Sequence, residues 1–360
     1  MGTKSKFTRM VKKYMKKAIV TGVTGQVGSY MADFLLKFTD MKVYGAIRRL
    51  SVPNHKNIEH IKDPNFELIE MDLGDEHSVF TTIQEIKPDY FINFAANSFV
   101  GNSWHMPVNH FDTNALGVMR QLEAIRKICP KCRYYNAGSS EEFGDVMYSP
   151  QDLNHPPRPR SPYGASKVAA RQIVKVWRDS YNLFAVQGYL FNHESERRGE
   201  EFVTRKITMN VARIKKELDE GKKPEPFELG NLEAKRDWSH AQDFVIAVWL
   251  MLKEDKPKDY LLASGETHTV KEFVEEAFKS ANIDTSWHEE ENPINTKLMC
   301  NKTGAILLKI NKAFYRPAEV ELLLGDPSEA QKDLHWEKSI DFSTLVRRMV
   351  EHDIKKINAT

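Results

Sequence analysis

The chain has 360 residues, of which 41% are apolar and 10% aromatic, enough to bury a sizeable core in one large or two modest domains. A formal net charge of +2 favours no particular partner, and no apolar run approaches the about 18 residues of a membrane span, so we expect neither a nucleic-acid nor a membrane partner. Three cysteines give no disulfide framework, which is typical of a reducing compartment and favours a cytoplasmic protein.

The chain begins with a basic cluster, "TKSKFTRMVKKYMKK". This cluster contains no acidic residue and lacks the apolar segment of a signal peptide. We therefore expect residues 1–15 to form a basic leader that is disordered.

From Lys17 onward, apolar strand patterns alternate with helical patterns. Strands are expected in "KAIVTG", "KVYGAIRR", "FELIEMDL", "YFINFAA", "RYYNAGS" and "LFAVQGYLF". Helices are expected in "VGSYMADFLLKF", "VFTTIQEIK", "NALGVMRQLEAIRKI" and "SKVAARQIVKVWRDSY". This alternation predicts an α/β fold, a Rossmann-type doubly wound parallel sheet with right-handed crossovers.

The character of the sequence changes after about residue 195, where charged clusters, prolines and short apolar runs predict a smaller α/β C-terminal lobe. We assign residues 16–195 to the Rossmann domain and residues 196–235 and 256–354 to the second lobe. The segment "HAQDFVIAVWLMLKE" reads as an amphipathic helix, so residues 236–255 are expected to return to the first domain.

Cys129 and Cys132 form a CxxC pair. A zinc site would need two more ligands, and no second such pair exists; a redox pair would need a thioredoxin-like frame, which the pattern does not show. We interpret both as incidental cysteines at a helix-to-strand turn and expect no metal site.

The segment "TGVTGQVGSY" places Gly22, Gly25 and Gly28 at the turn from the first strand to the first helix. Glycine allows close approach of a pyrophosphate, and a helix N-terminus offers N–H donors to it. This context favours dinucleotide binding over a purely structural turn.

The ends of the next two strands bear on the choice of dinucleotide. "AIRRLS" carries Arg48 and Arg49 where an NAD site usually has an acid, and guanidinium groups suit the 2′-phosphate of NADP. In "EMDLGD", Asp72 and Leu73 are placed to face an adenine, although Asp72 could equally be an exposed loop acid.

In "SPYGASK", Tyr163 and Lys167 lie four apart on one helix face. A lysine ammonium beside a phenol lowers its pKa, so Tyr163 could act as a base near neutral pH. Ser139 lies 24 positions upstream (163 − 139), and the combination with the glycine turn is a strong signal.

This combination resembles the extended short-chain dehydrogenase/reductase superfamily. Within it, four segments closely resemble the GDP-mannose 4,6-dehydratase family: "NHESERRGEEFVTRKI" (192–207), "LGNLEAKRDWSHAQDFVIAVWLML" (229–252), "NKTGAILLKINKAFYRPAEVELLLGD" (301–326) and "RSPYGASK". The resemblance runs from about residue 16 to 354. It implies oxidation of the sugar at C4, loss of water across C5 and C6, and return of the hydride to C6, so that tightly bound NADP is regenerated in each cycle.

The resemblance also implies roles for the catalytic residues. Tyr163 would be the base at O4, oriented by Lys167, and Ser139 would hydrogen-bond O4. Glu141 would take the C5 proton and deliver one to the departing C6 oxygen; its alternative is a solvated loop acid. If the backbone of "GSSEEFG" is extended, Ser139 and Glu141 share a face, and we expect Glu142 to be exposed and non-catalytic.

The remaining site residues follow from the same motifs. Cofactor-binding positions implied by the resemblance are Gly22, Gly25, Gln26, Val27, Gly28, Arg48, Asp72, Leu73, Ala95, Ala96, Ser98, Tyr163, Lys167, His193 and Arg198. Positions implied for the GDP-sugar, in the second lobe and beside it, are Asn192, Val203, Lys206, Gly230, Arg236, Arg316 and Glu319. His193 could instead be a satisfied core histidine. Family members are commonly tetramers, and "RRLSVPNHKN" corresponds to the loop that reaches a neighbour, so a homotetramer or dimer is expected.

Three departures from the family pattern leave the identity of the sugar in the substrate undetermined. Val27 replaces an aspartate, Glu196 replaces a proline, and "AANSFVGNSW" (95–104) is more similar to the related GDP-4-keto-6-deoxymannose reductases. The alternatives are such a 4-reductase, or a 4,6-dehydratase of GDP-heptose or GDP-N-acetylglucosamine. The long segment before "RPAEV" favours a dehydratase. A catalytically inactive NADP-sensing protein is the alternative from another class.

Overall fold

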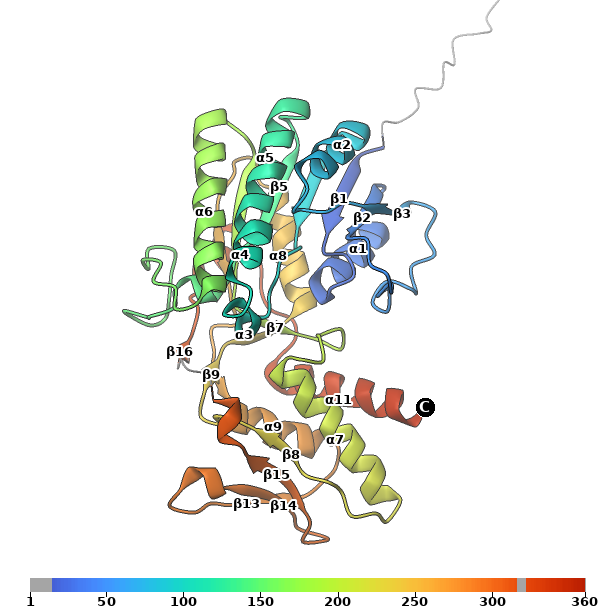
Figure 1. The fold of residues 1–360 in the computed structure, drawn as a ribbon, viewed down its shortest axis with the longest axis vertical. Helices are drawn as coiled ribbons and strands as arrows, with labels where there is room; N and C mark the ends of the chain where they lie inside the picture. The colour runs from blue at the N-terminus through green and yellow to red at the C-terminus, as the bar shows by residue number, and fades with distance from the viewer. Residues whose placement is uncertain (1–14, 316–321, 360) are drawn as a thin grey trace, which may run out of the picture.

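The computed structural model describes residues 15–315 and 322–359 (Figure 1). The expected basic leader therefore lies almost entirely outside the described residues. Figure 1 shows two parts, an upper one built on a large sheet and a smaller lower one that contains the C-terminal helix. No helix within the described residues is long and apolar enough to cross a membrane.

The upper part is built on a seven-stranded sheet in the order β11-β6-β5-β4-β1-β2-β3, and every neighbouring pair is parallel. Its strands are β1 (Lys17–Thr21), β2 (Lys42–Ile47), β3 (Phe66–Glu70), β4 (Tyr90–Asn93), β5 (Arg133–Ala137), β6 (Ala185–Leu190) and β11 (Tyr260–Leu262). The reversal of order between β1 and β4 is the switch point of a doubly wound fold. The predicted fold class is confirmed.

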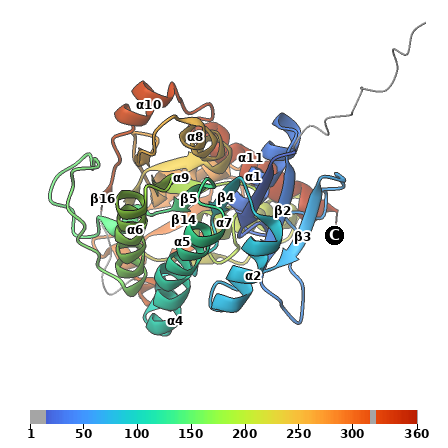
Figure 2. The same cartoon turned by 90° about the horizontal axis from the view of Figure 1, so that it is seen from above.

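Helices cover both faces of the sheet (Figure 2). On one face, α1 (Gln26–Phe38) and α8 (Ala241–Lys253) share a core with Ala18 and Val20 of β1. On the other, α2 (Glu76–Ile86), α5 (Gly117–Ile128) and α6 (Pro162–Tyr181) share a core with Ile19. Successive side chains of a strand point to opposite faces, so a strand with a helix layer on each side must be apolar throughout.

Short helices connect β4 to α5 and β5 to α6. The first connection contains α3 (Val100–Ser103), α4 (Pro107–Phe111) and the π-helix η1 (Asp112–Leu116), and the second contains the 3-10 helix η2 (Ser140–Glu142). Cys129 and Cys132 lie at the turn between α5 and β5, where the sequence placed them. No metal-holding group of His, Cys, Asp or Glu occurs in the ranges that the structure describes.

The lower part has its own core, formed by helices against a small sheet of order β13-β14-β15-β8. Its elements are α7 (Val203–Asp219), β8 (Phe227–Leu229), α9 (Val270–Ser280), β13 (Thr285–His288), η3 (Pro293–Asn295), β14 (Lys297–Cys300), β15 (Ile306–Ile310), η4 (Lys312–Phe314) and α11 (Phe342–Asn358). A buried ion pair joins α7 to α11, because Nη2 of Arg205 lies 2.6 Å from Oδ1 of Asp353.

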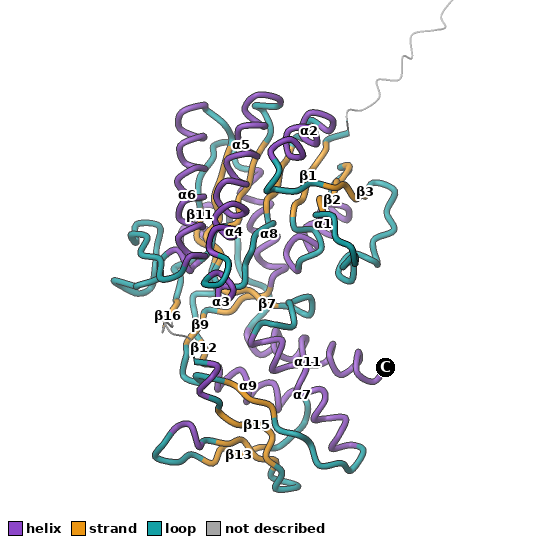
Figure 3. The backbone as a smooth tube through the Cα atoms, in the orientation of Figure 1, coloured by secondary structure: helices purple, strands orange, loops and turns teal. Residues whose placement is uncertain are grey.

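Short strands lie between the two parts (Figure 3). They are β7 (Asn192–Glu194), β9 (Lys235–Arg236), β10 (Trp238–His240), β12 (His268–Thr269) and β16 (Leu322–Leu323), in sheets of order β10-β7 and β12-β9-β16.

The expectation that the chain after residue 256 belongs to the lower lobe is wrong for two elements. Strand β11 pairs with β6 in the large sheet, and α10 (Ser328–Leu334) packs against β11 and α8. A three-residue strand carries too little periodicity to reveal its sheet. The other domain boundaries stay a prediction.

Candidate functional site

A cavity of about 1160 Å³ opens where the carboxyl ends of the parallel strands face the lower lobe. Its wall includes every predicted site residue within the described ranges. From the upper part these are Gly22, Gly25, Gln26, Val27, Gly28, Arg48, Asp72, Leu73, Ala95, Ala96, Ser98, Ser139, Glu141, Tyr163 and Lys167. From the chain after β6 they are Asn192, His193, Arg198, Val203, Lys206, Gly230 and Arg236. Arg316 and Glu319 lie outside the described residues.

The glycine turn has the backbone that a pyrophosphate site requires. Gly22 has a φ of +65°, which L side chains rarely adopt, and a Cβ on Gly28 would lie 2.2 Å from the Gly22 carbonyl oxygen. Helix α1 begins directly after Gly25, and no side chain caps its N-terminus. The first N–H groups of α1 therefore remain available to an anion at the cavity, which fits a dinucleotide.

The residues at the ends of β2 and β3 lie on the same side of the cavity. Arg48 is exposed directly after β2, and Asp72 is exposed while Leu73 is buried. The Asp72 carboxylate accepts a hydrogen bond of 2.9 Å from the backbone N–H of Gly74. Because β2 pairs with β1 in parallel, Arg48 follows the strand beside the one that ends at the glycine turn, and both line the cavity.

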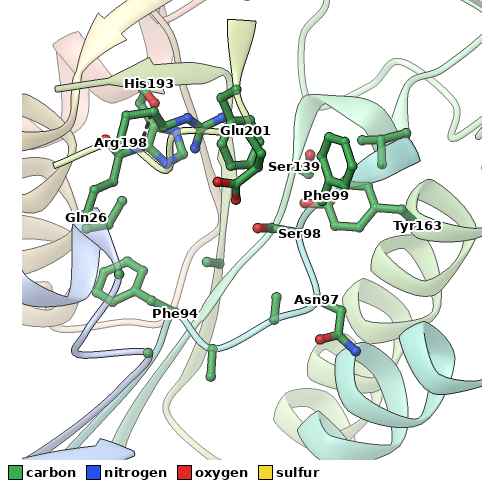
Figure 4. Close-up of a pocket in the computed structure, with 18 of the residues that line it drawn as sticks. Gln26, Phe94, Asn97, Ser98, Phe99, Ser139, Tyr163, His193, Arg198 and Glu201 are labelled. Atoms are coloured by element: carbon green, nitrogen blue, oxygen red, sulfur yellow. Dashed lines mark hydrogen bonds between the residues drawn. The ribbon is translucent and has the colours of Figure 1, made fainter. Parts of the chain in front are cut away.

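Ser139, Tyr163 and Lys167 meet at the end of β5 and the first turns of α6. Tyr163 is 7% exposed and lines the cavity together with Ser139. Lys167 donates from Nζ to the carbonyl oxygen of Ala137 at 2.8 Å, and its Nζ lies 5.9 Å from the centre of the Tyr163 ring. Figure 4 shows Ser139 and Tyr163 together on one side of the cavity.

The pKa of Tyr163 differs from the value expected from the sequence. Burial raises it to about 12, and the charge of Glu141 adds to this effect, while Ser139 and Arg198 oppose it. Burial also lowers the pKa of Lys167 to about 8. Burial therefore opposes the expected lowering of the Tyr163 pKa by Lys167, because desolvation disfavours the charged phenolate, and the role of Tyr163 as a base stays a prediction.

The stretch "GSSEEFG" turns into the 3-10 helix η2, so the extended backbone on which the shared face of Ser139 and Glu141 was conditional is not present. Ser139 caps this helix, and its Oγ accepts from the backbone N–H of Glu141 at 3.2 Å. Glu141 is half-buried and lines the cavity. Glu142 is 0% exposed and is not part of the cavity wall, so its predicted exposure is wrong.

His193 and Arg198 form the opposite wall (Figure 4). Nδ1 of His193 lies 2.8 Å from the carbonyl oxygen of Phe191. Burial and the charge of Arg198 lower the His193 pKa to about 4, so the neutral ring donates from Nδ1 and leaves Nε2 as an acceptor. Nε of Arg198 lies 3.0 Å from a carboxylate oxygen of Glu194, without the geometry of a hydrogen bond.

The lower-lobe wall combines cations with an uncapped helix end. Helix α7 begins at Val203 with no side-chain cap. Nζ of Lys206 lies 3.8 Å from the centre of the Phe314 ring, and Arg236 is 8% exposed on β9. A Cβ on Gly230 would lie 2.7 Å from the Phe314 carbonyl oxygen, so glycine allows this loop to close on η4.

Several lining residues were not predicted. Phe99 and Phe202 contact edge to face, with ring centres 6.1 Å apart, and Arg198 stacks over Phe202. The exposed Glu201 carboxylate points into the cavity (Figure 4). Both Glu201 and Phe202 lie inside "RRGEEFVTRK", a segment that resembles the family, so this resemblance could have identified them as site residues.

Two departures from the family pattern have clear positions. Val27 is buried in the first turn of α1. Glu196 accepts hydrogen bonds from Tyr30 at 2.8 Å and from Arg348 at 2.7 Å, and pairs with His240. Burial would raise the pKa of Glu196, but His240 and Arg348 outweigh it and hold that pKa well below its usual range. Glu196 thus joins the upper part to α11.

Comparison with known proteins identifies a family for this chain. The model of the family described as "GDP-mannose 4,6 dehydratase" matches residues 19–349. The GDP-mannose 4,6 dehydratase of Drosophila melanogaster is 43% identical over 94% of this chain and 86% of its own length. The GDP-mannose 4,6-dehydratase of Vibrio cholerae is 40% identical over 95% of this chain and 94% of its own length.

Solved structures share the fold at lower identity. A dTDP-glucose 4,6-dehydratase from Streptomyces venezuelae, solved with NAD, superposes with a TM-score of 0.78 at 18% identity, covering 95% of this chain and 98% of that one. The RMD protein of Pseudomonas aeruginosa, solved with NADPH, has a TM-score of 0.73 at 19% identity, covering 95% and 100%. These neighbours show the fold alone.

Proposed function

The chain belongs to the GDP-mannose 4,6-dehydratase family, and on that premise we propose that it converts GDP-mannose to GDP-4-keto-6-deoxymannose. One observation carries the proposal: the hydroxyls of Ser139 and Tyr163 and the carboxylate of Glu141 share one cavity with the uncapped turn at Gly25. A carbonyl-forming base and a second acid/base beside a dinucleotide site are what a 4,6-dehydratase needs.

The roles proposed for these side chains follow from their chemistry. Tyr163 takes the O4 proton, and Ser139 hydrogen-bonds O4. A dinucleotide held at the glycine turn would supply a hydride acceptor for C4 and, once reduced, a hydride donor for C6. Once C4 is a ketone, the C5 proton is acidic. Glu141 removes that proton and protonates the departing C6 hydroxyl, so that water leaves. When the hydride reaches C6, C5 takes up one proton from solvent, which balances the O4 proton that Tyr163 releases.

We assign the GDP moiety to the lower-lobe wall. The uncapped first turn of α7 at Val203 offers N–H donors to a diphosphate, and Lys206 and Arg236 add positive charge beside it. Asn192 would contact the sugar, and Gly230 would let the loop against Phe314 approach the nucleotide. Arg316 and Glu319 stay predictions for the same moiety.

Incubation with GDP-mannose and no added reductant tests the function. We expect a product lighter by one water, with no net change in nicotinamide absorbance, because the hydride returns within each cycle. GDP-heptose and GDP-N-acetylglucosamine serve as competing substrates in the same assay. Absence of water loss together with reduction of the 4-keto sugar by NADPH would instead indicate a 4-reductase, and absence of turnover with every GDP-sugar would refute an enzyme of this class.

We propose NADP as the dinucleotide, and Arg48→Ala tests this. The substitution should weaken NADP binding about 10- to 100-fold, since it removes charge-assisted hydrogen bonds to the 2′-phosphate, and should leave NAD binding nearly unchanged. Calorimetric titration with both dinucleotides gives the two constants. Lys62→Ala, at an exposed cation outside the cavity, is the control. Equal losses for both dinucleotides would refute the assignment.

We further propose a homo-oligomer and a cytoplasmic location. The loop after β2, residues 48–57, exposes Leu50 by 48% and Val52 by 81%, which supports contact with a second copy.

The cysteines support the cytoplasmic location. All three are free, which is typical of a reducing compartment.

A further inference from the structure

Glu142 lies directly behind the catalytic turn, fully buried between η2, α6 and β6. Its Oε1 accepts from the backbone N–H of Ser139 at 2.9 Å and from Nε2 of Gln187 at 3.3 Å. Together with the Ser139 cap this forms a capping box that closes η2. A Cβ on Gly138 would lie only 2.7 Å from Oε1, so glycine is needed for the carboxyl to reach the turn.

The carboxyl also ends a row of buried side-chain amides beneath the cavity. Gln187 accepts from Asn136 at 2.7 Å, and Asn136 accepts from Asn93 at 2.8 Å. Thr21 donates to Asn93 at 2.6 Å and accepts from the backbone N–H of Ala95 at 3.1 Å. The row therefore connects the catalytic turn, across β6, β5, β4 and β1, to the cofactor side of the cavity.

The carboxylate charge of Glu142 is poorly compensated. Oε2 has no hydrogen-bond partner, and the buried Nη1 of Arg171 also has none. Burial raises the Glu142 pKa to about 7, although the Ser139 N–H, Arg171 and Lys167 oppose it. The titratable and charged groups in the surroundings of Glu142 are Tyr163, Lys167 and Arg171 of α6, Tyr189 of β6 and Glu141 of η2.

We propose that Glu142 is a positioning residue for the reaction: its carboxyl closes the turn that carries Ser139 and Glu141, and its negative charge, buried behind that turn, opposes proton loss from Tyr163. This inference rests on the proposed function. An ionised Glu142 raises the pKa of Tyr163, so proton loss from Tyr163 is easier when Glu142 is neutral.

Two substitutions separate the charge from the hydrogen bonds. Glu142→Gln keeps an oxygen acceptor for Ser139 and Gln187 but is always neutral. The ascending limb of its kcat–pH profile should move to lower pH by about half a unit to one unit, with an unchanged KM. Glu142→Leu leaves two buried donors unpaired, so kcat should fall about 10-fold or more. A superimposable ascending limb for wild type and Glu142→Gln would overturn the proposal.

Thermal midpoints provide a readout that does not depend on activity. Burial raises the Glu142 pKa in the folded protein to about 7, against an ordinary pKa of 4.5 for a glutamate in the unfolded chain. The unfolded chain therefore releases this proton at lower pH than the folded protein does. As pH rises from 4.5 to 7, wild type should lose stability relative to Glu142→Gln. The difference between the two midpoints should therefore grow from pH 5 to pH 8. A constant difference would contradict the buried titration. Failure of wild type to release water from GDP-mannose would refute the proposed function and leave this comparison interpretable.

Discussion

Glu141→Gln should stop water loss while the sugar is still oxidised at C4. The amide can neither remove the C5 proton nor protonate the C6 oxygen, so the reaction should halt after the first step, with overall turnover reduced about 10²- to 10⁴-fold. Reduced nicotinamide should then accumulate on the enzyme, visible as its near-ultraviolet absorbance. In deuterated water, the exchange at C5 that accompanies proton removal should be lost.

The matched control for Glu141 is Asp145→Asn. Asp145 is the next acid along the chain after Glu142, is exposed, and pairs with Arg158 at 2.8 Å. Its substitution should leave turnover within about twofold, as is usual for an exposed ion pair. Normal water loss in Glu141→Gln would transfer the acid/base role to another carboxylate in the cavity, for which Glu201, whose carboxylate points into the cavity, is a candidate.

Tyr163→Phe should block the reaction one step earlier. The buried ring remains, but no phenolic oxygen is present to accept the O4 proton, so turnover should fall about 10²- to 10⁴-fold and no reduced nicotinamide should form. The Tyr163 pKa of about 12 gives the sign of the pH dependence: in wild type, activity should rise with pH as the phenol ionises more readily.

Tyr181→Phe is the control for Tyr163. Tyr181 ends the same helix and is 47% exposed, outside the cavity, so its substitution should preserve both steps. Accumulation of reduced nicotinamide by Tyr163→Phe would contradict the assignment, since hydride transfer from C4 requires loss of the O4 proton.

The layered fold and most of the site could be predicted because their signals are local in sequence. The apolar strands and the turn containing Gly22 each depend on neighbours within a few residues. Tyr163 and Lys167 share a helix face by spacing alone. Resemblance to the family then led to residues of the second lobe that share no local pattern with the glycine turn, and the structure places those it describes in the same cavity wall.

Only the tertiary structure decided the environment of each charged group. The sequence "SSEE" is compatible with exposure of either glutamate. In the structure, Glu142 is buried by contacts with α6 and with Gln187, which lies 45 positions away, whereas Glu141 lines the cavity. The same burial raises the pKa of Tyr163 against the expectation from Lys167. Periodicity is set by the nearest residues along the chain. Desolvation depends on what covers a side chain in space, and for these groups the covering residues come from distant segments.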